Sequence, residues 1–289
     1  MCERRCLFVS TDSSAFMMDH HGRCLTAAVS GLLVIAMVQS AFGDDRPSGR
    51  SVEKVSLTVV YDNRTERDVL TEDWGFACVV DGFEKRILFD TGAKGDILLH
   101  NLRHLEIDPA SFDIIVISHA HWDHVGGLGA LLLQNKNARV VLLESFPSEL
   151  HSQIRSLGGT VLPVTGPTEI CPGVRTGGEM GTSIKEQALV LDLAEGLVVL
   201  TGCSHPGICH MLEEIKEREG KPILLVLGGF HLMEKSESEM EQIMGRIHSL
   251  GVRRVAPCHC TGEEQIQKFR QSYGERFIDV GVGALVSLP

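Results

Sequence analysis

One stretch carries most of the information in this sequence: Ser118-His119-Ala120-His121-Trp122-Asp123-His124-Val125-Gly126-Gly127. It follows the apolar run Ile114-Ile115-Val116-Ile117 directly and is dense in imidazole and carboxylate groups. In an extended segment, residues two apart point the same way, so His119 and His121 face one side of the chain. Asp123 and His124 lie in a tighter turn and project toward a neighbouring point. The pattern predicts two adjacent metal positions fed by one loop, rather than a polar turn that is merely rich in histidine.

The composition is that of an ordinary globular protein. The chain has 289 residues, 43% of them hydrophobic and 22% charged, and α/β folds often use this length as a single domain. Its formal net charge is -11, and its lysines and arginines do not cluster, whereas proteins that bind a nucleic-acid backbone carry such clusters. We therefore expect a small-molecule substrate and no nucleic-acid partner. The composition leaves the oligomeric state open.

The first 43 residues have the pattern of a secretory signal peptide. An apolar run at residues 25–38 follows Arg23 and precedes Ala41-Phe42-Gly43, a small-x-small cleavage pattern. The run is short for a membrane span of about 20 residues, so we expect membrane contact only if the segment stays uncleaved. The expected organisation is a signal peptide at 1–43, a polar linker at 44–53 and a folded domain at 54–289. The mature protein would be exported, periplasmic or extracellular.

Apolar periodicity and turn residues predict the order of strands and helices. Strands are expected at residues 54–61, 74–80, 86–89, 114–117, 140–143, around 161 and 174, and at 188–193, 197–200, 223–227, 252–256 and 277–280. Helices are expected at residues 94–105, 126–134, 147–157, 208–218, 236–250 and 262–272. Two strand-rich stretches, each followed by helices, predict an αββα sandwich, in which two mixed β-sheets pack together and helices cover the outer faces.

Three later segments repeat one order, in which an apolar strand is followed by glycine or proline and then by a ligand. They are Gly202-Cys203-Ser204-His205, Gly228-Gly229-Phe230-His231 and Pro257-Cys258-His259-Cys260. Loops at the ends of one layer of strands converge on one rim, which lets residues far apart in sequence share a metal. The candidate ligands that these loops add are Cys203, His205, His231 and His259.

These motifs resemble those of a known family. His119-Ala120-His121-Trp122-Asp123-His124, with Phe89-Asp90-Thr91-Gly92 upstream, resembles the HxHxDH pattern of the metallo-β-lactamase superfamily, and the resemblance runs from about Val55 to the C-terminus. The three later loops are similar to those of the group named for a dihydropterin-aminobenzene-phosphate synthase. The resemblance implies the αββα metallo-β-lactamase fold and a metal-dependent enzyme.

The resemblance also implies which residues bind metal. His119 and His121 would bind a first ion. Asp123 and His124 would bind a second ion, and His259 would complete that second position. Two divalent ions are thus expected as cofactors.

The sequence agrees with the family pattern at one further aspartate and departs from it at one histidine. Asp90 matches the superfamily aspartate that orients the ligand histidines through their other ring nitrogen. Many relatives supply a further histidine from a turn that corresponds to residues 181–187, and this segment contains none. His205 and His231 are the candidates to replace it, and the sequence does not choose between them.

Cys203 bears on the identity of the metal. It stands where hydrolase relatives place a bridging aspartate and where one lactamase subgroup places a zinc-binding cysteine. A thiolate there would favour zinc, whereas histidine and carboxylate ligands alone leave zinc, iron and manganese open. A buried thiol beside the site, without a bond to metal, accounts for the residue equally well.

The expected activity is hydrolysis by a metal-activated water. Asp123 would act as the catalytic residue by holding that water, and the substrate would be a small ester, phosphoester or related compound. A synthase-like transferase is the alternative that the group name implies. An iron-based redox enzyme and a non-catalytic metal-binding or sensing protein are the other interpretations.

Overall fold

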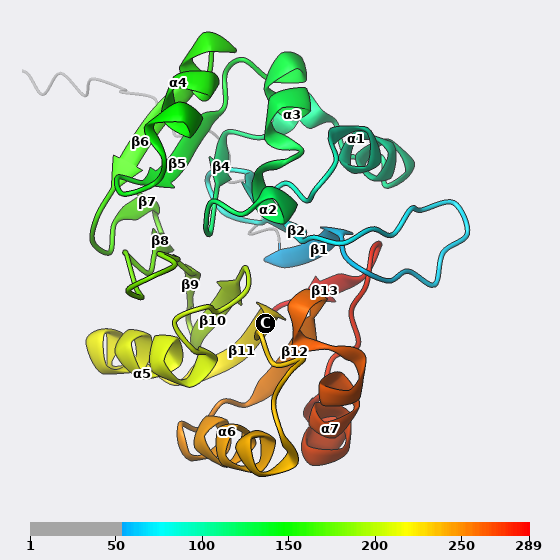
Figure 1. The fold of residues 1–289 in the computed structure, drawn as a ribbon, viewed down its shortest axis with the longest axis vertical. Coiled ribbons are helices and arrows are strands. Elements are labelled where there is room, and N and C mark those ends of the chain that lie inside the picture. The colour runs from blue at the N-terminus through cyan, green and yellow to red at the C-terminus, as the bar shows by residue number, and fades with distance from the viewer. Residues whose placement is uncertain (1–53) are drawn as a thin grey trace, which may run out of the picture. The chain divides into compact units, whose positions relative to one another are not determined.

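The structure is a computed structural model that describes residues 54–289, and Figure 1 shows how its helices and strands are arranged. The predicted signal peptide at 1–43 and linker at 44–53 lie outside the described residues. Within residues 54–289, no helix combines the length and the apolarity needed to cross a membrane.

The first sheet has seven strands in the order β13-β1-β2-β3-β4-β5-β6. Its strands are β1 (Ser56–Tyr61), β2 (Ala77–Asp81), β3 (Ile87–Phe89), β4 (Ile114–Val116), β5 (Arg139–Leu143), β6 (Thr160–Val164) and β13 (Leu285–Ser287). Pairing is parallel from β3 to β6 and antiparallel on the side of β1. The helices beside it in Figure 1 are α1 (Gly95–His104), α2 (Trp122–Val125), α3 (Leu128–Gln134) and α4 (Ser148–Ser156), and a short 3-10 turn, η1 (Pro109–Ser111), precedes β4.

The second sheet has six strands in the order β12-β11-β10-β9-β8-β7. Its strands are β7 (Glu169–Cys171), β8 (Val174–Thr176), β9 (Leu189–Leu193), β10 (Gly196–Thr201), β11 (Ile223–Gly229) and β12 (Arg254–Cys258). The strands β10, β11 and β12 are parallel. The helices and turns that follow them are α5 (Ile208–Glu219), α6 (Glu237–Ser249), η2 (His259–Thr261), α7 (Glu263–Tyr273) and η3 (Gly274–Arg276).

Alternate residues of the central strands face two different cores. In β10, Val198 and Leu200 pack into the core shared with the first sheet, whereas Val199 packs into the core under the outer helices. In β11, Leu225 and Val226 divide in the same way. Because side chains alternate along a strand, a slip of one residue would exchange the two cores, so the apolar pattern fixes the register. The fixed register determines where the loops at the strand ends lie.

The predicted αββα sandwich is confirmed, and two local predictions are wrong. Residues 277–280 form no strand: Phe277 makes an isolated bridge with Val255, and Asp279 is held by ion pairs with Arg64 and Arg270 instead of a ladder. The last strand is β13, which pairs with β1. Residues 169–171, for which the apolar pattern predicts no strand, form the short strand β7.

Candidate metal centre

Three histidines from the two sheets point their ring nitrogens at one another. His119 follows β4, His121 precedes α2, and His205 follows β10. His119 Nε2 lies 3.1 Å from His121 Nδ1, and His205 Nε2 lies 3.2 Å from each of these two nitrogens. The three side chains form one candidate ligand group. Of the two candidates to replace the missing turn histidine, His205 lies beside His119 and His121, and His231 does not belong to this group.

The spacing of these nitrogens suits a metal ion better than it suits hydrogen bonding. A neutral imidazole has one ring nitrogen with a lone pair, and lone pairs that face one another repel unless a cation lies between them. Nitrogen ligands about 2.0–2.1 Å from a tetrahedral zinc ion lie roughly 3.3 Å apart. The observed separations are close to that value, so the first group fits a divalent ion.

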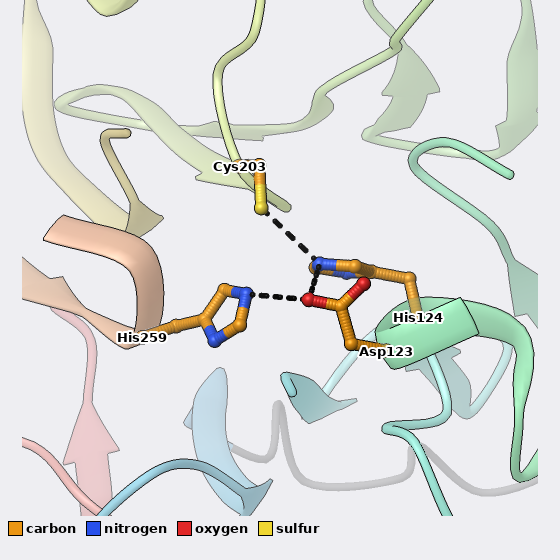
Figure 2. Close-up of side chains that lie close together, drawn as sticks. All are labelled: Asp123, His124, Cys203 and His259. Atoms are coloured by element: carbon orange, nitrogen blue, oxygen red, sulfur yellow. Dashed lines mark hydrogen bonds and ion pairs between the residues drawn. The ribbon is translucent and has the colours of Figure 1, made fainter. Parts of the chain in front are cut away.

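The second candidate group consists of Asp123, His124, Cys203 and His259, all buried (Figure 2). His259 Nε2 lies 3.3 Å and His124 Nε2 3.7 Å from Asp123 Oδ2. Cys203 Sγ lies 3.3 Å from His124 Nε2. The two groups adjoin, because the ring centroids of His119 and His124 are 4.2 Å apart. One carboxylate, two imidazoles and one thiol thus meet beside the three histidines.

His259 contributes a buried nitrogen whose close polar neighbour is the Asp123 carboxylate. Its Nε2 is buried and, among the described residues, makes no hydrogen bond of good geometry; it lies 3.3 Å from Asp123 Oδ2. Its backbone N–H donates to Asp62 Oδ1 (2.9 Å), and its Nδ1 lies 3.1 Å from Asn63 Oδ1. An unpaired buried nitrogen is unfavourable by about 1–3 kcal/mol, and a bound cation would satisfy it. The second group therefore also fits a metal ion.

Asp90, at the end of β3, determines which ring nitrogens are available. Its Oδ2 accepts from Ser118 Oγ and lies 2.7 Å from His124 Nδ1, while Ser118 Oγ lies 2.9 Å from His119 Nδ1. Since Ser118 Oγ donates to Asp90, it accepts from His119. Nδ1 therefore carries the proton in both histidines, and both Nε2 lone pairs face the centre. Asp90 thus lies where the sequence predicts an orienting aspartate.

Glu186 organises the turn that carries Cys203 and His205. Its buried carboxylate accepts three backbone N–H groups, from Cys203 (2.9 Å), Ser204 (2.8 Å) and His205 (2.8 Å). Gly202 is required just before this turn, because a Cβ there would lie 2.0 Å from Ser118 Oγ. Glu186 comes from the segment 181–187, in which the family pattern led us to expect a histidine, and it holds the turn that carries two candidate ligands.

Burial and neighbouring charges shift the pKa values of the histidines in different directions. Burial, followed by the charges of neighbouring histidines, holds the pKa of His119 well below its ordinary value and lowers that of His205 to about 4. Burial also lowers the pKa of His124, but the carboxylates of Asp90, Asp123 and Glu186 together outweigh it and raise that pKa above its ordinary value. For Asp123, burial acts against ionisation, and the neighbouring His259 and His124 lower its pKa nonetheless. At neutral pH, His119 and His205 are thus uncharged and Asp123 is a carboxylate.

Trp74 is the aromatic neighbour of the centre. Its Nε1–H donates to Asp123 Oδ2 (2.9 Å), and its ring centroid lies 5.0 Å from that of His259. The side chain is 37% exposed. Trp74 therefore fixes the carboxylate from one side and offers apolar surface to solvent on the other.

His231 belongs to neither group described so far. It forms a third candidate group with Cys203 and His205, and its ring centroid lies 4.4 Å from that of His205. It is exposed, whereas Cys203 is buried.

Sequence reasoning thus found the cysteine and histidine side chains that meet here but missed several groups that hold them. The missed residues are Asp62, Asn63, Trp74, Ser118 and Glu186. Ser118 belongs to the quoted histidine-rich stretch, and only its role was missed; the other four come from segments without a ligand pattern.

Comparisons with known proteins agree with the fold. The model of the metallo-beta-lactamase superfamily matches residues 75–178. The solved structure of Tm1679, a metal-dependent hydrolase of the beta-lactamase superfamily, is 30% identical, with a TM-score of 0.70 and coverage of 81% of this chain and 99% of that one. The 7,8-dihydropterin-6-methyl-4-(beta-D-ribofuranosyl)-aminobenzene-5'-phosphate synthase of Methanocaldococcus jannaschii is 29% identical over 71% of this chain and 85% of its own length. The metallo-beta-lactamase fold protein YhfI of Bacillus subtilis shares the fold, with a TM-score of 0.62 at 11% identity, over 81% of this chain and 99% of its own.

Proposed function

This chain belongs to the metallo-β-lactamase superfamily, and on that premise we propose that it is a metal-dependent hydrolase of a small ester, phosphoester or related substrate. One observation carries the proposal: two adjoining ligand groups converge between the sheets, and each draws side chains from both. The superfamily fold implies divalent metal ions, and these residues are the candidates to bind them. The 30% identity to a metal-dependent hydrolase supports the reaction class.

In this proposal, each candidate residue has a role in binding an ion or in positioning water. His119, His121 and His205 would hold one ion, and Asp123, His124, Cys203 and His259 the other. Divalent ions in such a site polarise a substrate oxygen and lower the pKa of a water molecule toward neutrality. Asp123, fixed by Trp74, positions the attacking water as the catalytic residue.

Asp90 and the outer wall of the centre complete this assignment. Asp90 keeps the protons of His119 and His124 on the nitrogens that face away from the centre, so their lone pairs stay available. The exposed face of Trp74 provides an apolar wall for a small substrate. Zinc is the metal that a thiol at Cys203 favours.

A synthase-like transferase is the second candidate. It is supported by the 29% identity to the archaeal synthase, which this chain matches over 85% of that protein's length. The same ligand groups would serve it, because polarising a substrate oxygen assists group transfer as well as hydrolysis. The two candidates differ in whether water or a second substrate attacks.

Metal analysis combined with a substrate panel tests the proposal. Protein purified without added metal is assayed for metal content, loaded with Zn²⁺, and tested on chromogenic carboxylic esters, phosphoesters and a lactam. We expect turnover on at least one ester or phosphoester, and a fall by orders of magnitude in His119→Ala and Asp123→Ala with unchanged circular dichroism. His210→Ala and Asp96→Ala, which change exposed residues on α5 and α1, are the matched controls.

Two outcomes would count against hydrolysis. A full complement of bound metal without turnover on any panel member would favour the transferase or a sensing protein. Full activity in both His119→Ala and Asp123→Ala would separate the activity from these ligand groups.

A further inference from the structure

His231 is the histidine at this centre that the two inner ligand groups leave unused. It follows β11 directly and has a left-handed backbone with φ of 53°, although it is not glycine. Such a conformation is unfavourable by about 1–3 kcal/mol and persists where the surrounding structure enforces it. Ser204, in the neighbouring turn, is left-handed as well, with φ of 63°. The two strained turns bring the His231 and His205 rings together.

The three side chains of the third group, Cys203, His205 and His231, differ in how far solvent reaches them. One ligand atom each from Cys203, His205 and His231 lies within 4.8 Å of the others. His231 is exposed, His205 is half-buried and Cys203 is buried. The all-buried group of Asp123, His124, Cys203 and His259 has no member that solvent reaches freely. An ion that binds there must therefore come past other side chains.

We propose that Cys203, His205 and His231 form a third metal position, at the mouth of the centre, through which a zinc-class divalent ion enters. This inference rests on the proposed function, because the inner positions are the destination of the ion. The third position shares Cys203 with the second group and His205 with the first. An ion bound there moves inward by exchanging His231 for an inner ligand, without returning to solvent.

The chemistry of the three side chains fits this role. Imidazole and thiolate are ligands for zinc and other borderline or soft ions, whereas calcium and magnesium prefer oxygen. On binding, the Cys203 thiol loses its proton to water and the imidazoles bind through lone pairs, so no oxidant or reductant is needed. Within the third group His231 is the exposed member, so an ion that enters there meets it before His205 and Cys203. Loss of His231 should slow loading without removing an inner ligand.

Loading kinetics of the full chain test the proposal. Metal-free protein is mixed with Co²⁺ in a stopped-flow instrument, and the thiolate-to-cobalt absorption reports the rate at which ions from solvent reach Cys203, which the second and third groups share. Loss of a group that supports a metal site lowers metal affinity by about 10- to 100-fold. At Co²⁺ concentrations that leave the third position mostly empty, its occupancy falls by the same factor, so we expect His231→Ala to load about tenfold more slowly or slower still. Its final metal content should equal that of the unchanged protein. His231→Cys, which restores a ligand atom, should restore the rate, and His210→Ala on α5 should not alter it.

Three results would overturn the proposal. Loading of His231→Ala at the unchanged rate would mean that ions enter past His121. A lower final metal content in His231→Ala would make His231 a resident ligand. A slow His231→Cys would attribute the effect to something other than a ligand atom. Failure of the unchanged protein to bind two ions would instead overturn the proposed function, so the two failures are distinguishable.

Discussion

Asp90 makes no contact with a metal in the proposed centre, yet the lone pairs of two ligands depend on it. Its Oδ1 accepts the Ser118 N–H at 2.7 Å, and its Oδ2 serves Ser118 Oγ and His124 Nδ1. Asp90 itself adopts a left-handed backbone with φ of 60°. That strain, of about 1–3 kcal/mol, is offset by three hydrogen bonds, each worth about 0.5–1.5 kcal/mol or more where a charge takes part.

Glu186 gives a prediction at the same scale. In Glu186→Gln, the side-chain amide would present a donor to backbone N–H groups that also donate, so the turn that carries Cys203 and His205 must move. We expect Zn²⁺ affinity to fall by about 10- to 100-fold, which is the usual loss when a ligand's supporting partner is changed. Competition with a chromogenic chelator measures the affinity.

The control for that prediction is Glu169→Gln, which changes an exposed glutamate on β7. Equal affinities in the two variants and the unchanged protein would mean that the turn holds its shape without the Glu186 charge. Our assignment of Glu186 as a positioning residue would then be wrong.

The ligands were predictable from sequence because their signal is local, and the residues that hold them were not. His119, His121 and His124 stand within six positions of one another, so their spacing is visible in a single loop. By contrast, Asn63 meets His259 across 196 positions, and Trp74 meets Asp123 across 49. Such contacts form only when distant parts of the chain pack together, and no local pattern around Asn63 or Trp74 predicts them.

The strands that could be predicted from sequence are those with many buried residues. Strands such as β10 and β11 are long apolar runs, because both of their faces pack against a core. The strands β7 and β13 have three residues each; β13 buries only its middle residue, and β7 begins with an exposed glutamate. A strand of three residues is too short to show the alternation of apolar and polar residues by which strands are predicted. The strand predicted at residues 277–280 was wrong because Phe277 and Val280 pack against apolar neighbours without pairing in a ladder.

The start of α6 yields a prediction on pH. Ser236 and Glu239 form a reciprocal capping box, and hydrogen bonds from Ser236 lower the pKa of Glu239 to about 2. Because the folded-state pKa is below that of an unfolded glutamate, about 4.3, the ionised group stabilises the fold above that value. The contribution disappears as pH falls toward 2. Glu239→Gln should therefore be less stable than the unchanged protein at pH 7, and the difference should shrink on acidification.

Urea unfolding at a series of pH values measures that difference. Glu241→Gln, which changes an exposed glutamate on the same helix, is the control and should show a smaller difference at pH 7. A Glu239→Gln deficit that stays constant from neutral pH to the acid range would contradict the capping assignment.

For the whole molecule, the proposed ions join the two sheets. The first group takes His119 and His121 from loops after β4 and His205 from the loop after β10. The second group likewise takes Asp123 and His124 from the first half of the chain, and Cys203 and His259 from the second. Neither sheet alone carries a complete set. Metal binding should therefore be coupled to the packing of one sheet on the other.

That coupling predicts a metal-dependent gain in global stability. An ion that binds only the folded state at 100 times its dissociation constant adds about 2.7 kcal/mol to the free energy of unfolding. We expect Zn²⁺ to raise that free energy in urea titrations and a chelator to reverse the gain. In His205→Ala the part due to the first position should be lost, because His119 and His121 would then hold the ion from one sheet alone. His210→Ala should keep the whole gain. If His205→Ala also kept it, the ion would be held within the first sheet's loops, and the metal would not join the two halves of the fold.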